Sequence, residues 1–174
     1  MKALYPWQQI QWQALMARLH EGRLPHALLL NGPEGLGKND FARLFGEALL
    51  CEQPDSTGMP CEACRSCKLI LAGTHPDLRI LSPLEDKKVI AVDQIREMTG
   101  YFSLTAQYAG YKIVIITPAE RMNVNAANSL LKTLEEPAEK SLLLLVSSRT
   151  SSLPATIRSR CQKISFLVPP EDQA

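Results

Sequence analysis

Residues 27–39 of this 174-residue chain, ALLLNGPEGLGKN, give the clearest indication of its fold. This stretch begins with a short apolar run that predicts a buried strand. The glycine-rich loop that follows has the pattern G-x-x-x-x-G-K, which is typical of a phosphate-binding loop. Its glycines allow backbone N–H groups to turn inward around phosphate oxygens, and its lysine adds a positive charge. Residues 39–50 predict a helix, so the loop has the strand–loop–helix context that such a site requires.

The loop departs from its pattern at one position. Gly32, Gly37 and Lys38 are in place, but Asn39 stands where a Ser or Thr hydroxyl would hold Mg²⁺. The backbone around Gly35 and the start of the helix can still bind a phosphate group or ATP. The alternative is that the loop only shapes a tight turn between strand and helix. The sequence does not decide between these two interpretations.

A hydrolysing domain of this kind also needs acidic residues after a second buried strand, where an Asp holds Mg²⁺ and a Glu activates water. The strand predicted at residues 112–117 ends with Thr117 at the Asp position, and Pro118 follows at the Glu position. Glu120 is the nearest carboxylate, and we interpret it as a solvated loop residue. Together with Asn39, these departures remove both protein ligands of Mg²⁺ and the base, which predicts loss of ATP hydrolysis.

Four cysteines follow the helix with the spacing C-x9-C-x2-C-x2-C; they are Cys51, Cys61, Cys64 and Cys67. This spacing predicts a tetrahedral zinc site. Four sulfur ligands leave no position for water, so the zinc would be structural. It would hold together an insertion at about residues 51–67 that has few apolar residues of its own. The alternatives are free thiols, or redox chemistry by Cys64 and Cys67.

The rest of the chain alternates predicted strands with predicted helices. Continuous apolar, β-branched runs suit parallel strands that are buried on both faces. The prediction is therefore an α/β fold, a doubly wound parallel five-stranded sheet with helices on both faces. Strands are predicted at residues 27–30, 78–81, 112–117, 142–146 and 164–167, and helices at residues 7–20, 39–50, 92–103 and from Asn123 or Asn125 to Pro137.

Several single residues receive structural interpretations. The first helix is expected to bury a face that carries Trp7, Ile10, Ala14 and Leu15, and Trp12 is expected to pack as well. A lone histidine before proline, His75, is interpreted as a hydrogen-bonding residue and not as a metal ligand. Cys161, far from the other cysteines, is interpreted as an ordinary buried cysteine.

Composition excludes few functions. Apolar residues make up 45% of the chain and charged residues 21%, which is typical of a globular protein. The net charge of +1 gives no argument for or against nucleic acid. No apolar stretch approaches the roughly 18 residues of a membrane span, and the N-terminus lacks the apolar core of a signal peptide. We therefore expect a cytoplasmic protein that is not associated with a membrane.

Three further motifs carry a resemblance to a known family. They are Leu130-Leu131-Lys132-Thr133-Leu134-Glu135-Glu136-Pro137, Ser159-Arg160-Cys161, and Thr74-His75-Pro76-Asp77 just beyond the cysteines. With the degenerate loop and the cysteine insertion, they make the chain resemble the N-terminal AAA+ domain of the delta prime subunits of bacterial DNA polymerase III. The resemblance covers essentially the whole chain. The related gamma/tau motor subunits keep the loop Ser/Thr and the Asp-Glu pair. The departures at Asn39, Thr117 and Pro118 therefore favour delta prime.

The resemblance implies a subunit of the DNA polymerase III holoenzyme that does not hydrolyse ATP itself. Such a subunit belongs to a five-membered ring with gamma/tau motor subunits and a delta subunit. The ring opens the sliding clamp and places it on primer–template DNA. Arg160 would be an arginine finger that acts in trans on the ATP site of a neighbour, because a guanidinium can fork onto γ-phosphate oxygens. Without the resemblance, Arg160 would be interpreted as a surface ion pair, and Arg158 is the nearby alternative finger.

The resemblance also sets the expected domain boundaries. We expect the AAA+ domain at residues 1–170, and residues 171–174 as the start of a linker toward lid and collar domains that family members carry. Without a collar, the isolated domain is expected to be monomeric.

Two alternative functions stay open at this stage. One is a weak ATPase of the gamma/tau type that uses Lys38, Asn39 and Glu120. The other is a zinc-dependent nucleic-acid-binding module, for which Arg65 and Lys68 would supply a small basic surface.

Overall fold

Five parallel strands form one sheet in the order β2-β3-β4-β1-β5. The structure is a computed structural model and describes residues 4–108 and 110–169. The predicted doubly wound parallel sheet is confirmed, whereas the predicted linker at residues 171–174 lies outside the described residues. The strands are β1 (Ala27–Asn31), β2 (Leu78–Leu81), β3 (Lys112–Ile116), β4 (Ser141–Ser147) and β5 (Gln162–Ser165).

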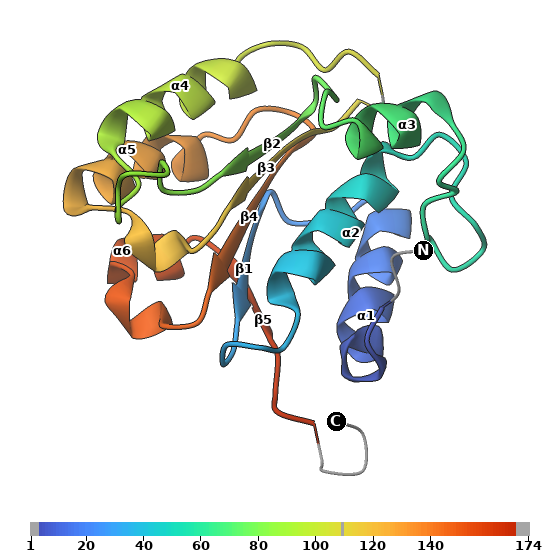
Figure 1. Cartoon of the computed structure of the whole chain (residues 1–174), viewed down its shortest axis with the longest axis horizontal. Helices are drawn as coiled ribbons and strands as arrows, with labels where there is room; N and C mark the ends of the chain where they lie inside the picture. The colour runs from blue at the N-terminus through green and yellow to red at the C-terminus, as the bar shows by residue number, and fades with distance from the viewer. Residues whose placement is uncertain (1–3, 109, 170–174) are drawn as a thin grey trace.

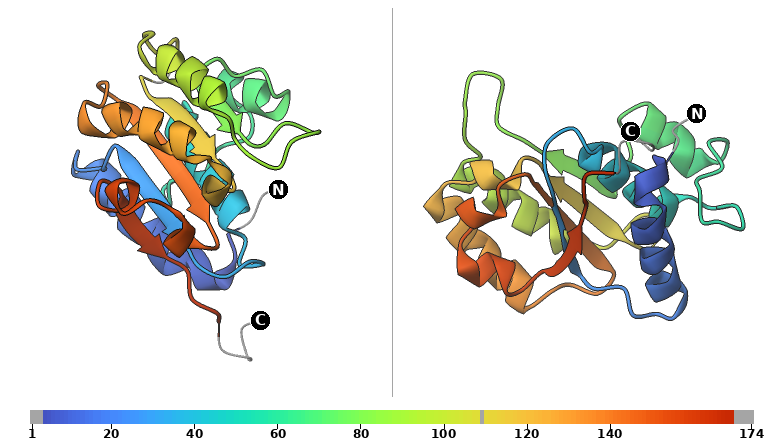
Figure 2. Two further views of the ribbon diagram at one scale, coloured as in Figure 1. Left: turned by 90° about the vertical axis from the view of Figure 1, so that its left-hand side faces the viewer. Right: turned by 90° about the horizontal axis from the view of Figure 1, so that it is seen from below.

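Helices cover both faces of the sheet, as Figures 1 and 2 show. α1, α2 and α3 lie on one face, and α4, α5 and α6 lie on the other. No helix in the described part of the chain is both long and apolar enough to cross a membrane. The helices are α1 (Gln9–His20), α2 (Lys38–Leu50), α3 (Arg65–Leu71), α4 (Val92–Phe102), α5 (Val124–Glu135) and α6 (Ala155–Arg158), with 3₁₀ turns at Pro6–Gln8, Ala119–Arg121 and Thr150–Ser152.

The alternation of side chains along the strands divides the core into two clusters. In β1, Leu28 and Leu30 pack against α1 and α2, whereas Ala27 and Leu29 pack against the helices of the other face. Because both faces are covered, successive residues must all be apolar. This explains why β1, β3 and β4 read as continuous apolar runs in the sequence.

The predicted buried face of the first helix is only partly correct. Leu15 is buried, but Ile10 is 79% exposed and Ala14 is exposed, while Trp12 is buried against aromatic rings of α2. The chain enters α1 through the 3₁₀ turn Pro6–Gln8. A 3₁₀ turn has three residues per turn, so counting an α-helical period from Trp7 places the inner face at the wrong positions.

Short elements were the ones that the sequence did not reveal. Neither α3 nor α6 was predicted, and β5 begins two residues earlier than expected. α3 starts inside the cysteine insertion, where the Cys64 Sγ accepts a hydrogen bond from the Cys67 N–H as its N-cap. By contrast, the predicted cap of α5 is confirmed: the Asn123 side chain accepts from the Ala126 N–H at 2.8 Å.

Candidate functional site

The glycine-rich loop connects the end of β1 to the start of α2, and four of its five predicted residues, all except Gly32, line one hollow of about 490 Å³ there. Gly37 precedes α2 with a φ of 69°, in the left-handed region that favours glycine. A Cβ atom at Gly32 would lie 2.4 Å from the carbonyl oxygen of Phe166, so only glycine fits where the loop passes the end of β5. Gly35 lines the same hollow as Gly37.

Lys38 is the first residue of α2 and is only 5% exposed. Its Nζ donates hydrogen bonds to the carbonyl oxygen of Pro33 and, over 3.1 Å, to the Oγ of Ser148. Burial lowers the pKa of Lys38, while the nearby carboxylates of Glu120 and Glu34 act in the opposite direction. The ammonium group is therefore held inside the loop by partners within this chain.

The residues that depart from a hydrolysing site contact one another. Thr117, directly after β3, donates a hydrogen bond from its Oγ1 to the Oδ1 of Asn39 at the start of α2. Pro118 lines the same hollow. The bond joins the two positions at which a hydrolysing domain would place its Mg²⁺ ligands. The structure thus brings together all three departures that the sequence singled out.

Glu120 corrects a sequence-based interpretation: the prediction of a solvated loop residue is wrong. The side chain lies in the turn Ala119–Arg121, is partly buried and lines the hollow. Its Oε1 accepts a hydrogen bond from the Ser148 N–H at 3.1 Å, and its Oε2 is buried without a hydrogen-bond partner among the described residues. The 3₁₀ turn carries this carboxylate back to the loop, which residue spacing alone does not reveal.

Two contributors to this site were missed at the sequence level. Ser148 follows buried strand β4, and a polar residue at that position is a usable signal because ligands bind beyond the carboxyl ends of parallel strands. Tyr5 lines the hollow and stacks on Trp7 with a centroid distance of 4.9 Å. The side chain of Gln8 holds this segment in place by donating to the carbonyl oxygens of Leu36 and Gly37, at 2.9 and 3.1 Å.

The four cysteines of the insertion come together as predicted. The sulfur atoms of Cys51, Cys61, Cys64 and Cys67 all lie within 4.8 Å of one another. Backbone N–H groups of the same segment point at three of the sulfurs, at 3.2 to 3.4 Å. Sulfurs at such spacing around one centre, with N–H donors behind them, fit a tetrahedral metal ion with metal–sulfur distances of about 2.3 Å.

Electrostatics at the cysteines also favours a cation. Burial raises the pKa values of Cys51 and Cys67, whereas backbone N–H groups of Ala63 and Cys64 lower the pKa of Cys61 to about 6. Bringing several thiolates together costs free energy unless a positive charge compensates them. A divalent cation supplies that charge and deprotonates its thiol ligands. The residues present therefore fit a structural zinc ion.

His75 is a structural residue, as predicted, and is not in the cysteine group. Its Nδ1 accepts a hydrogen bond from the Asp77 N–H at 3.1 Å, so the proton is assigned to Nε2, which lies 3.3 Å from the Ser66 Oγ in α3. Burial lowers the pKa of His75, which keeps the ring neutral. The ring thereby joins the insertion to the segment that leads into β2.

Asp77 forms a buried junction next to His75. Its fully buried carboxylate accepts hydrogen bonds from the N–H groups of Gln107 and Tyr108 and pairs with Lys112 at 3.4 Å. The Lys112 side chain is itself only 6% exposed. The carboxylate fixes the turn before β3 at the starting ends of β2 and β3.

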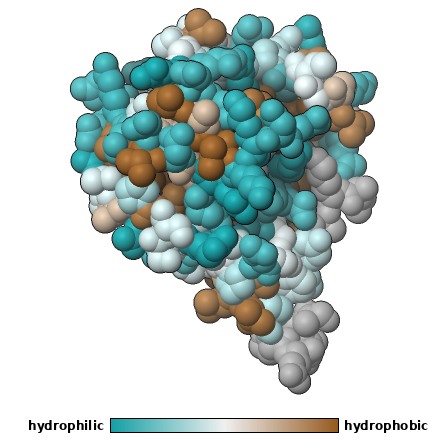
Figure 3. All heavy atoms as spheres, turned by 60° about the vertical axis from the view of Figure 1, so that its left-hand side comes forward, coloured by the Kyte–Doolittle hydropathy of each residue, from teal (hydrophilic) through white to brown (hydrophobic). Residues whose placement is uncertain are grey.

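Arg160 lies in the turn between α6 and β5, at the strand-start edge, which we define as the edge where the parallel strands begin. Its Nη1 donates to the Thr156 carbonyl oxygen at 2.9 Å, and its Nη2 donates to the Glu135 Oε1 at 2.7 Å. The side chains of Arg160 and Glu135 are 35% and 50% exposed. The face covered by α4, α5 and α6 is mostly hydrophilic, with small apolar areas between (Figure 3).

The structure does not bring Arg160 to the loop of the same chain. The loop lies at the opposite, strand-end edge, which includes Lys38, Thr117 and Ser148. Strand β5 runs from one edge to the other, and four residues of strand span about 13 Å.

Arg158 is exposed in the last turn of α6. Cys161 is only partly buried, and burial raises its pKa to about 11.

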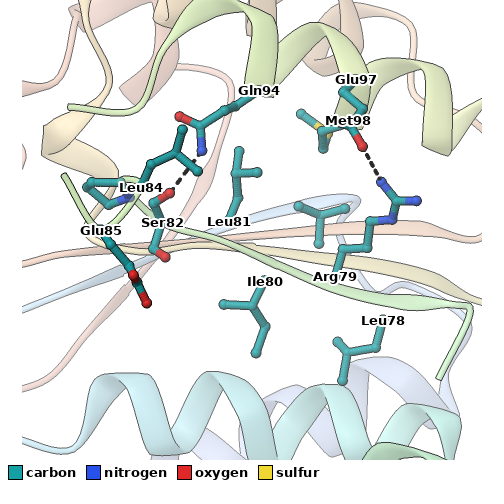
Figure 4. Close-up of a pocket in the computed structure, with 12 residues that line it drawn as sticks. Leu78, Arg79, Ile80, Leu81, Ser82, Leu84, Glu85, Gln94, Glu97 and Met98 are labelled. Atoms are coloured by element: carbon teal, nitrogen blue, oxygen red, sulfur yellow. Dashed lines mark hydrogen bonds and ion pairs between the residues drawn. The ribbon is translucent and has the colours of Figure 1, made fainter. Parts of the chain in front are cut away.

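A larger hollow of about 610 Å³ lies beside β2 and α4 (Figure 4). Its lining includes neither the glycine-rich loop nor Arg160. It is lined mostly by aliphatic side chains of β2 and the following loop. Gln94 donates to the Ser82 carbonyl oxygen at 3.0 Å, and Arg79 pairs with Glu97 at 3.2 Å across its rim. These contacts fix the loop against α4 and give no convergent set of reactive groups.

The sheet order and the glycine loop define a P-loop domain of the AAA+ class. A DNA polymerase III gamma subunit-related protein from Thermotoga maritima has a similar structure, with a TM-score of 0.65 and 24% sequence identity. The match covers 92% of this chain and 47% of that chain. At this identity the likeness shows the fold alone.

Sequence comparison then gives the family. Residues 7–170 match the family described as DNA polymerase III, delta subunit. The delta prime subunit of Pseudomonas aeruginosa is 48% identical over 161 residues, and that of Escherichia coli K12 is 39% identical over 169 residues. These matches cover 92% and 97% of this chain, and 48% and 50% of those proteins. The DNA polymerase III subunit tau of Bacillus subtilis is 33% identical over 154 residues, 88% of this chain and 27% of that protein.

The chain therefore belongs to the delta prime family of DNA polymerase III subunits. It spans about half the length of the delta prime relatives it matches.

Proposed function

We propose that this chain is the AAA+ domain of a clamp-loader subunit that does not hydrolyse ATP and supplies Arg160 to the ATP site of a neighbouring subunit. The observation that carries the proposal is the separation of the two charged regions. Arg160 lies at the strand-start edge, whereas the loop lies at the strand-end edge. At that position the guanidinium lies away from the loop of its own chain, so the phosphate group that we propose as its ligand would be bound by another chain.

The hydrogen bonds that the loop makes within the chain support a site that does not hydrolyse ATP. Lys38 is bonded to Pro33 and Ser148, and Asn39 is bonded to Thr117. Phosphoryl transfer depends on positioned charge around Mg²⁺. Asn39 stands at the position of the hydroxyl that would hold the ion, and Thr117 at that of the carboxylate. The cradle at Gly35 and Gly37 can still take a phosphate group, without a consequence for hydrolysis.

The partners follow from the family. The gamma/tau subunits would be the motors whose ATP Arg160 approaches, and a delta subunit would complete the ring. The sliding clamp and primer–template DNA would be contacted through the assembled complex. The activity of the whole subunit is part of this proposal, because the chain spans about half of its relatives.

Zinc is the metal we propose for the cysteine insertion. The cluster is all-sulfur and within tetrahedral reach, so the ion would stabilise the fold and would not bind a reacting water. A nucleic-acid-binding role for this insertion has weaker support. Arg65 lies over the ring of Tyr108, 5.0 Å from its centroid, and is therefore engaged within the chain.

The test uses the full-length subunit assembled with its motor and delta subunits. Arg160→Ala should lower DNA- and clamp-stimulated ATP hydrolysis by about tenfold or more, because arginine fingers contribute factors of about 10³ or greater at a single site. Arg158→Ala is the matched control and should stay near the wild-type rate. Gel filtration checks that the ring still assembles. An unchanged rate for Arg160→Ala in an intact ring would exclude the finger.

One observation supports a second candidate function, a weak ATPase. The Glu120 carboxylate lines the hollow and keeps one oxygen without a partner among the described residues. Mg²⁺-dependent turnover by the purified full-length subunit alone, lost in Lys38→Ala, would establish this alternative. We expect no turnover above the background of the Lys38→Ala protein.

A further inference from the structure

The contacts of Arg160 define more than its position. The Nη1 of the guanidinium is bonded to the Thr156 carbonyl oxygen in α6, and its Nη2 is bonded to the Glu135 carboxylate at the end of α5. The two partners therefore come from two different helices. This pair of bonds fixes both the direction of the side chain and the rotation of its planar head.

Glu135, which binds Arg160 within the same chain, is the last residue of α5, and the end of this helix is held in place. The carbonyl oxygen of the preceding residue, Leu134, lies 3.0 Å from the Nε2 of His26, directly before β1. The Leu134 side chain is buried in the core cluster of that face. The end of α5 is thus tied to the start of the central sheet, and a carboxylate on such an element presents a fixed oxygen.

The guanidinium still has capacity for a further ligand. Arginine has five N–H donors, and each of the two bonds uses one of them. With 35% of the side chain exposed, the remaining donors can face an approaching anion while both bonds persist. The geometry is that of a group oriented before it meets its ligand, because the ligand need not displace Glu135.

We propose that Glu135 is a positioning residue that pre-orients Arg160 for a phosphate group bound by the neighbouring subunit. The inference rests on the proposed function of Arg160. A free arginine must give up rotamer freedom when it docks, and a side chain already held at both terminal nitrogens gives up less. Loss of Glu135 leaves only the Thr156 anchor, so the cost of docking rises while the guanidinium itself remains.

The experiment measures stimulated ATP hydrolysis by the assembled full-length complex. Glu135→Ala should lower kcat by about three- to tenfold with little change in KM for ATP, because ordering one long side chain costs a free energy of that size. Glu135→Asp, which keeps the charge on a shorter arm, should recover part of the rate. Glu139→Gln, an exposed carboxylate on the turn after α5, is the matched control and should behave as wild type.

A double-mutant cycle separates positioning from a general structural effect. If Glu135 acts through Arg160, adding Glu135→Ala to Arg160→Ala should cause no further loss. The thermal midpoint of Glu135→Ala should also stay close to wild type, because exposed ion pairs contribute little to stability. Additive losses, or a higher rate in Glu135→Ala, would overturn the inference.

The two proposals fail in different ways. A reduced rate in Arg160→Ala with an unchanged rate in Glu135→Ala overturns the positioning role alone. An unchanged rate in Arg160→Ala overturns the finger and the positioning role together.

Discussion

The two edges of the sheet use charged residues in opposite ways. At the strand-end edge, Lys38, Asn39 and Thr117 are bonded to partners within the chain. At the strand-start edge, Arg160 is held by Glu135, yet 35% of its side chain stays exposed. Both edges belong to one rigid sheet, so the difference arises from the residues that follow or precede the strands.

Under the proposed function, a nucleotide-binding fold loses hydrolysis at one edge of the sheet and keeps an arginine finger at the other. Hydrolysis needs several groups at the strand-end edge at once. In this chain Asn39 and Thr117, two of the three departures from the hydrolysing pattern, are bonded to each other. A trans-acting arginine needs only a rigid mount at the other edge. The cysteine insertion and the Asp77 junction stabilise that edge, because residues 51–77 connect the end of α2 to the start of β2.

The largest effect is expected from removing the zinc ion that we propose for the cysteine insertion. Cys64→Ser should lose bound zinc and more than about 4 kcal/mol of stability, since the insertion has little apolar material to hold it. Metal analysis and thermal unfolding of the full-length subunit measure both. Cys161→Ser is the control and should keep the metal. If wild-type protein without zinc were as stable as wild-type protein with zinc, the result would contradict a structural zinc site.

The Asp77 junction should give the next largest effect. Asp77→Asn leaves the buried ammonium of Lys112 without its charged partner and should cost about 3–5 kcal/mol. Urea unfolding gives the value, and Asp93→Asn, an exposed carboxylate, should change it by less than about 0.5 kcal/mol. Equal stability of the two variants would show that the junction does not hold this edge.

The smallest effect probes the strand-end edge. Thr117→Val removes the hydrogen bond to Asn39 and should cost about 1 kcal/mol, the usual net contribution of one such bond. The same urea measurement applies, with Thr105→Val as an exposed control expected near zero. A gain in stability would mean that the two side chains are not bonded, and the contrast between the edges would weaken.

The amino-acid sequence was enough to predict the architecture and most residues of the candidate site. Continuous apolar runs predicted β1, β3 and β4, because only strands covered on both faces tolerate them. Cysteine spacing predicted that the four cysteines come together, since two overlapping C-x2-C steps bring sulfur atoms close to one another. The departures at Asn39, Thr117 and Pro118 were visible because the loop and strand patterns assign a residue type to each position.

Apart from the cysteines, the contacts between these residues could be seen only in the folded chain. The return of Glu120 to the loop depends on a 3₁₀ turn, and the bond between Asn39 and Thr117 joins positions 78 residues apart. The pairing of Arg160 with Glu135 depends on how α5 and α6 dock at the start of the sheet. Periodicity reports the environment of one element at a time, whereas a contact between elements is set by packing, so only the folded chain reveals it.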